Sequence, residues 1–217
     1  MKSKFIDFML SAFFPNKCPY CKKNIKPDMT ECPECLEKMP TVPKKAMTSA
    51  GIPCIAPFSY DGEVRNSIID FKFNSIAFNA ESYAKRLCFT IEYYHILDEF
   101  DIITFVPLSK IRKNERGFNQ SETVAKLVGE SLDKPVMPLL KKIRQNKNQH
   151  DLNFAERIEN VKGIYMPVHA EYAKGKNILL IDDIATTGNT LSECCRVLHE
   201  SGANNIICIA IAIAGAV

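Results

Sequence analysis

One stretch decides the fold of this chain: Ile178-Leu179-Leu180-Ile181-Asp182-Asp183-Ile184-Ala185-Thr186-Thr187-Gly188-Asn189-Thr190. Four apolar residues predict a buried strand, two carboxylates follow at its carboxyl end, and a turn of threonines and glycine opens onto a helix. Ligands of open α/β sheets bind at that end of the strands. Free N–H groups at a helix start favour phosphate, and paired carboxylates suit sugar hydroxyls or a divalent cation. A ribose phosphate fits these requirements.

Two other interpretations account for parts of this stretch. In the first, the acidic pair only caps a turn and the threonines only cap the helix. In the second, the strand and its acidic pair form the magnesium-binding strand of a nucleotide triphosphatase, which also requires a G-x-x-x-x-G-K-[ST] phosphate loop. The sequence contains neither that loop nor a G-x-G-x-x-G motif, so nucleotide triphosphatase and dinucleotide-binding functions are excluded.

Around this stretch, short apolar runs alternate with longer helical ones, a pattern typical of a parallel sheet with crossover helices. The predicted strands are Cys54 to Tyr60, Ile102 to Val106, Ile178 to Ile181 and Ile206 to Ile211. The predicted helices are Glu63 to Phe73, Ala80 to Tyr94, Ser121 to Leu132 and Thr190 to Ser201. Gly202 follows the last helix as a cap. The pattern therefore predicts an α/β domain over residues 48–217, after a proline-containing linker.

The composition is that of an ordinary globular protein, with 46% hydrophobic and 24% charged residues among 217 and a formal net charge of +3. No apolar run reaches the roughly 18 residues of a membrane helix. The apolar stretch near the N-terminus is interrupted by Asp7 and lacks a small-residue cleavage site. We therefore expect a cytoplasmic protein that does not insert into membranes.

The cysteines fall into two groups. Two Cys-x-x-Cys pairs lie within residues 18–35, and this spacing is typical of a closed structural zinc site with ligands Cys18, Cys21, Cys32 and Cys35. A redox or iron–sulfur role is the alternative. The remaining five are expected to be buried packing thiols: Cys54, Cys88, Cys194, Cys195 and Cys208. Residues 1–47 thus form an N-terminal segment whose ribbon is more suited to a folding staple than to catalysis.

The stretch 178–190 resembles the phosphoribosyl diphosphate (PRPP) signature of type I phosphoribosyltransferases. Together with the four-cysteine ribbon, the chain resembles the ComF family. Further matches are Tyr60-Asp61-Gly62 with Arg65, Phe71-Lys72-Phe73, Val106-Pro107-Leu108, Arg116-Gly117-Phe118-Asn119-Gln120, and then Arg144, Gln149, Leu152, Arg157 and Asn160. Asn189 departs from the alanine that is usual in the loop. The resemblance implies a type I phosphoribosyltransferase-like α/β fold, mainly a parallel sheet flanked by helices, behind a small zinc ribbon.

The resemblance also implies roles for individual residues. Asp182 and Asp183 would contact the ribose hydroxyls and take the catalytic role. The 5′-phosphate would be held by Ala185, Thr186, Thr187, Gly188, Asn189 and Thr190. The diphosphate, accompanied by Mg²⁺, would meet Leu108, Ser109, Lys110 and Arg116. The basic run 110–116 can also be read as a solvated helix start. Arg144 belongs to a polar stretch, 141–160, that resembles the flexible loop closing over PRPP.

The implied reaction is displacement at the anomeric carbon of PRPP with release of diphosphate, although no side chain identifies the acceptor. The resemblance further implies a role in DNA uptake during natural transformation, alongside a competence helicase. An alternative function is a non-catalytic, PRPP-sensing adaptor that binds single-stranded DNA. A third is a zinc-dependent adaptor on a degenerate transferase fold. The oligomeric state is left open.

Overall fold

The computed structural model describes residues 16–48, 50–73, 78–144 and 162–215. At its centre is a sheet with the strand order β1-β2-β8-β7-β4, in which β3 also pairs with β8. All pairs are parallel except β1 with β2. The strands are β1 (Lys44–Met47), β2 (Pro53–Ala56), β3 (Phe58–Ser59), β4 (Ile102–Phe105), β7 (Asn177–Ala185) and β8 (Asn205–Ile213). The predicted, mainly parallel sheet is confirmed.

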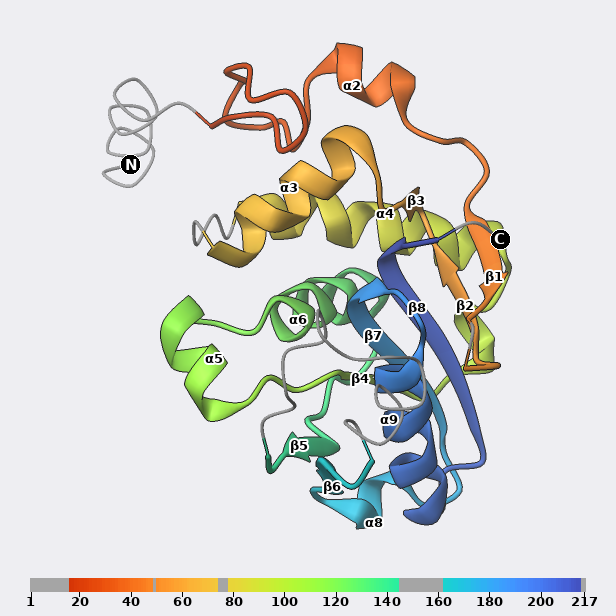
Figure 1. Ribbon diagram of the computed structural model, residues 1–217. Helices are drawn as coiled ribbons and strands as arrows, with labels where there is room; N and C mark the ends of the chain where they lie inside the picture. Colours follow the sequence, from red (N-terminus) through yellow and green to blue (C-terminus); the bar gives the residue numbers. More distant parts are fainter. Residues whose placement is uncertain (1–15, 49, 74–77, 145–161, 216–217) are drawn as a thin grey trace, which may run out of the picture.

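Helices lie on both faces of this sheet (Figure 1). One layer packs on β4, β7 and β8 through α4 and α6, with α3 beside α4, and the other face carries α9. The long helices are α3 (Gly62–Phe73), α4 (Asn79–Tyr93), α6 (Gln120–Leu132) and α9 (Asn189–Glu200). Each begins one residue before its predicted start. As expected, Gly202 follows α9 with a φ of +90° and donates its N–H to the His199 carbonyl.

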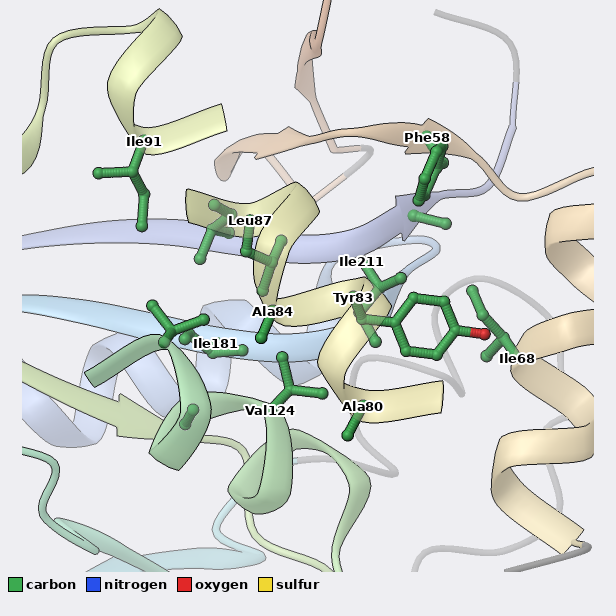
Figure 2. Close-up of a cluster of buried hydrophobic side chains, with 14 of the residues drawn as sticks. Phe58, Ile68, Ala80, Tyr83, Ala84, Leu87, Ile91, Val124, Ile181 and Ile211 are labelled. Atoms are coloured by element: carbon green, nitrogen blue, oxygen red, sulfur yellow. The ribbon is translucent and has the colours of Figure 1, made fainter. Parts of the chain in front are cut away.

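Strand alternation divides the core into two clusters. Leu179 and Ile181 of β7 point into the layer of α3, α4 and α6, whereas Ile178 and Leu180 point toward α9. Figure 2 shows the first cluster, in which Leu87 and Tyr83 of α4 lie near the strands and the Tyr83 ring extends toward Ile68 of α3. Because both faces of the central strands are buried, their sequences are continuous apolar runs.

The four-cysteine segment packs on the helical layer instead of standing apart from it. Tyr20 contacts the rings of Phe58 and Tyr83 edge-on, at centroid distances of 5.8 and 6.5 Å. Its hydroxyl lies 3.0 Å from Ser82 Oγ on α4. A further anchor is the ion pair between the buried Glu31 and Arg86 of α4. The segment and the sheet domain therefore share one hydrophobic core.

The remaining elements are short: α2 (Pro33–Lys38), the 3₁₀ turn η1 (Leu97–Glu99), α5 (Lys110–Arg116), β5 (Leu140–Lys142), β6 (Tyr165–Pro167) and α8 (Ala170–Ala173). Strands β5 and β6 form a separate antiparallel pair beside α9. The sequence did not predict β1, β5, β6 or the extent of α5. The predicted division into 1–47 and 48–217 stays a prediction; β1, at the end of the first part, already belongs to the sheet.

Within the described ranges, no helix is both long and apolar enough to cross a bilayer. Of the five cysteines expected to be packing thiols, Cys54, Cys194, Cys195 and Cys208 are buried and Cys88 is half-buried. Most of the polar stretch 141–160, including Lys147, His150 and Arg157, lies outside the described residues.

Candidate functional site

The acidic pair lies inside β7 instead of after it. The predicted strand ended at Ile181, but β7 continues to Ala185, because Ile184 and Ala185 still pair with Ala212 and Ile213 of β8. Neighbouring residues of a strand point to opposite faces. Asp182 and Asp183 therefore meet different surroundings although they are adjacent in sequence.

Asp183 faces the helical layer that contains α3. Its Oδ2 lies 2.9 Å from Lys72 Nζ, and the two side chains are only 15% and 16% exposed. Arg116 also feels the Asp183 charge, which opposes the lowering of the arginine's pKa by burial. Asp183 is thus surrounded by cations from α3 and α5.

Asp182 is buried, and its Oδ1 accepts hydrogen bonds from the Asp183 backbone N–H at 2.8 Å and from Ser121 Oγ at 3.3 Å. Ser121 is held in place because Asn119 caps α6, accepting from the Ser121 N–H while donating to the Val106 carbonyl. Burial, followed by the charge of Asp183, raises the pKa of Asp182 to about 7. Burial and the neighbouring Asp183 charge therefore both favour the protonated form of Asp182.

The threonine loop connects β7 to α9. Gly188 has a φ of +80°, in the left-handed region that glycine adopts without strain, and α9 begins at the next residue. The helix start has no side-chain cap among the described residues, so the N–H groups of its first turn remain available to an anion. The Asn189 side chain is 5% exposed, and its Nδ2 has no hydrogen-bond partner within the described part of the chain. These donors are consistent with phosphate binding.

A basic rim comes from the turn between β4 and α5. Ser109 caps α5 by accepting the Arg112 N–H at 3.3 Å, Leu108 is half-buried and Lys110 is exposed. Arg116, at the end of α5, lies over the Phe73 ring at 5.3 Å and donates to Gln120 Oε1 at 3.2 Å. Of the four residues assigned to the diphosphate, Arg116 is the one for which the described residues give an electrostatic interaction with the acidic pair, through Asp183.

Arg144 lies beyond the end of β5, and its guanidinium donates to the Lys162 carbonyl at 2.9 Å. Its side chain is exposed. The described contacts therefore place Arg144 on the backbone at residue 162 and do not bring it to the acidic pair.

Two further basic residues act on the acidic pair: Lys72, from a stretch that matches the family, and Lys142, which the sequence placed in the flexible loop. Lys72 pairs with Asp183, and the Lys142 ammonium lies over the Tyr165 ring at 5.5 Å. Burial, and then the charge of Arg112, lowers the pKa of Lys142 to about 8, while Cys194 and Asp182 oppose this effect. The sequence placed Lys142 in the flexible loop expected to close on the diphosphate, whereas in the structure it is the last residue of β5. The buried Leu139 and Leu140 just before it are the signal for a strand.

The cysteine pairs meet as predicted. The Sγ atoms of Cys18, Cys21, Cys32 and Cys35 all lie within 4.8 Å of one another. Cys32 caps α2, because its Sγ accepts the Cys35 N–H at 3.4 Å. In a tetrahedral zinc site the sulfur atoms are about 3.8 Å apart. The cluster fits zinc, and no second group of three or more possible ligands occurs among the described residues.

The model of the family described as phosphoribosyl transferase domain matches residues 94–216, more than half of the chain. Competence protein ComFC of Streptococcus pneumoniae is 29% identical over 87% of this chain and 77% of that protein. Competence protein F of Haemophilus influenzae is 25% identical over 87% of this chain and 81% of that protein. This chain belongs to the phosphoribosyl transferase domain family and, within it, to the ComF family.

This ComF-family chain also matches competence protein ComFC of Bacillus subtilis, with 29% identity over 67% of the chain, and spans 57% of that protein's length. Among solved structures, an adenine phosphoribosyltransferase from Thermoanaerobacter pseudethanolicus is 12% identical at a TM-score of 0.41, covering 83% of this chain and 99% of that one. The phosphoribosylpyrophosphate synthetase of Mycobacterium smegmatis is 21% identical at a TM-score of 0.38, covering 60% and 33%. The ComF-family chain has the predicted type I phosphoribosyltransferase fold with a four-cysteine segment in front.

Proposed function

We propose that this ComF-family chain binds PRPP together with Mg²⁺ and transfers its phosphoribosyl group to an acceptor, releasing diphosphate. The observation that carries the proposal is the meeting of three groups at one end of the parallel sheet. These groups are the acidic pair, the uncapped start of α9 and a set of cations from α3, α5 and β5. Each group matches a different part of PRPP.

The threonine loop is suited to the 5′-phosphate. The N–H groups at the start of α9 and the dipole of this 12-residue helix both favour an anion. The unpartnered Asn189 amide adds a buried donor at the same place. Residues 185–190, with Thr186, Thr187 and Thr190 as hydroxyl donors, therefore form the proposed phosphate subsite.

The acidic pair is suited to the ribose hydroxyls, because carboxylates accept hydrogen bonds from a diol. Arg116 and Lys142, with Leu108, Ser109 and Lys110 at the rim, face the side where the diphosphate would lie. Magnesium, which accepts carboxylate and phosphate oxygens as ligands, would neutralise the leaving diphosphate. In the reaction, the bond from C1′ to the diphosphate oxygen breaks and a bond from C1′ to the acceptor forms. The chain contributes positioning and electrostatic stabilisation.

The four-cysteine cluster is proposed to hold a structural zinc ion. Four thiolates complete a tetrahedral site and leave no position for substrate. The segment around the cluster is packed on α4, as Tyr20 and the Glu31–Arg86 pair show. The zinc would therefore stabilise this docked segment and take no part in chemistry.

The relatives named competence proteins, and the Escherichia coli relatives named DNA utilization protein YhgH, suggest the biological setting. We propose a role in DNA uptake, in the cytoplasm, with single-stranded DNA and a competence helicase as the partners to test. Only the family resemblance supports these two partners, because no contact in the described residues identifies them.

The test is a titration of PRPP and Mg²⁺ into the wild type and into an Asp182→Ala/Asp183→Ala double variant. We expect the double variant to weaken binding by more than about a hundredfold, since two carboxyl groups that accept hydrogen bonds are removed. Asp101→Ala is the matched control: its carboxylate accepts the Asn177 N–H at the opposite end of β7. Equal affinity of the double variant and the wild type would refute the site assignment.

The non-catalytic adaptor uses the same PRPP site, so a second measurement separates the two functions. Diphosphate release is followed with PRPP, Mg²⁺ and candidate nucleobases. Release that disappears in the double variant supports transfer. PRPP binding without release from any acceptor, together with salt-dependent binding of single-stranded DNA, supports the adaptor.

A further inference from the structure

The turn between β1 and β2 packs against the threonine loop. Its first residue, Thr48, closes the turn twice: its N–H donates to the Ile52 carbonyl at 2.9 Å, and its Oγ1 accepts the Ile52 N–H at 3.0 Å. The Gly51 N–H also donates to the Thr48 carbonyl, at 2.8 Å. Thr48 is 6% exposed. Its side chain is therefore fixed by the turn to which it belongs.

Thr48 occupies the space beside the Cα of Gly188. A Cβ placed on Gly188 would lie 2.1 Å from Thr48 Oγ1 and 2.4 Å from Thr48 Cβ. Glycine is thus required at this position for two reasons, its φ of +80° and the threonine packed against it. The turn reaches the loop a second time, where the Ala50 N–H donates to the Thr187 carbonyl at 2.9 Å.

These two contacts fix the peptide between Thr187 and Gly188. In a trans peptide the carbonyl and the N–H point in opposite directions. Since the Thr187 carbonyl points to Ala50, the Gly188 N–H points away from the turn. If this peptide flipped, the Gly188 N–H would face the Ala50 N–H, and two donors would oppose each other. The flip would also rotate Gly188 into Thr48.

We propose that Thr48 is a positioning residue for the phosphate-binding loop. It holds Gly188 from outside the site, and the turn thereby directs the Gly188 N–H to the side where the first-turn donors of α9 are open. The inference rests on the proposed function, because the loop is taken to bind the 5′-phosphate of PRPP. Thr48 also connects the four-cysteine segment with the ligand site, because the chain that follows this segment forms β1, and β1 leads directly into Thr48.

The test compares Thr48→Ala with Thr48→Ser, which keeps the hydroxyl, and with Thr90→Ala. Thr90 is the matched control, a fully buried threonine on α4 whose Oγ1 donates to the Arg86 carbonyl at 2.8 Å. Amide hydrogen exchange of residues 186–192 is first measured without ligand. We expect exchange there to rise about tenfold in Thr48→Ala and to stay at the wild-type rate in the other two. This measurement does not depend on PRPP.

PRPP affinity is then measured by calorimetry. We expect Thr48→Ala to weaken binding about tenfold, as for one misdirected hydrogen bond to a charged group, and Thr48→Ser to stay within about twofold of the wild type. Unchanged loop exchange in Thr48→Ala, or an equal rise in Thr90→Ala, would overturn the positioning role. Failure of the wild type itself to bind PRPP, with loop exchange as expected, would instead overturn the proposed function.

Discussion

Replacing Asp182 with asparagine is expected to stabilise the protein. Burial holds the pKa of this carboxyl at about 7, against a usual value of 3.8. Each pKa unit of difference between the folded and unfolded chains corresponds to about 1.4 kcal/mol. The charged form therefore costs up to about 4 kcal/mol at pH 8. Asparagine keeps the shape and the oxygen that accepts from Ser121 and from the Asp183 N–H, and it carries no charge.

The effect has a defined pH window. Because the pKa is raised in the folded protein, the folded chain binds more protons than the unfolded chain between pH 3.8 and about 7. The contribution of Asp182 to stability therefore falls as the pH rises through this range. The advantage of Asp182→Asn is expected to be about 2 kcal/mol at pH 5 and about 4 kcal/mol at pH 8.

Urea unfolding of the PRPP-free protein at pH 5 and pH 8 measures this difference. Asp183→Asn is the contrasting variant: it leaves Lys72, 16% exposed, without its carboxylate, and is expected to destabilise by about 2 kcal/mol. The two Asp→Asn substitutions, at adjacent positions, should thus change the free energy of unfolding in opposite directions. The reasoning is refuted if Asp182→Asn is neutral or destabilising at pH 8, or if its advantage is the same at both pH values.

Three further outcomes are expected. Lys142→Met should raise the free energy of unfolding below pH 8, because burial penalises the charged lysine. Thermal melts should show that this advantage of the variant disappears as the pH rises from about 8 to 10.5. Arg86→Met leaves the buried Glu31 without its ion-pair partner and should lower the free energy of unfolding, measured in urea, by about 3 kcal/mol. Adding Glu31→Gln should restore most of the lost stability. Cys32→Ser should lower the zinc content from about one ion per chain, by atomic absorption, whereas Cys88→Ser should not.

Much of the fold could be predicted from local pattern. The four long helices begin within one residue of their expected starts, because their apolar spacing and caps are properties of neighbouring residues. The apolar runs of β4, β7 and β8 were found because strands buried on both faces lack polar positions. Strands β1 and β5 were missed, since Lys44-Lys45 and Lys141-Lys142 make them look like loops. Their pairing partners, β2 and β6, supply the stabilisation that propensity does not.

The candidate site divides in the same way. Asp182, Asp183 and the threonine loop were found as one run of sequence, and the four cysteines by their spacing. Lys72 reaches Asp183 from more than a hundred positions away, and Thr48 reaches Gly188 from a similar separation. No local signal connects such pairs, because their contact depends on how α3 and the β1–β2 turn are placed around the sheet.

By itself, the sequence determined the class of fold, the family resemblance, the four-cysteine cluster and the acidic pair with its threonine loop. These features are encoded in spacing and in order along the chain. Only the tertiary structure decided that the two aspartates have different surroundings, with Asp182 buried on the side of Cys194 of α9 and Asp183 paired with Lys72 of α3. The physical reason is that successive side chains of β7 point to opposite faces of the sheet, and each face is covered by elements from distant parts of the chain.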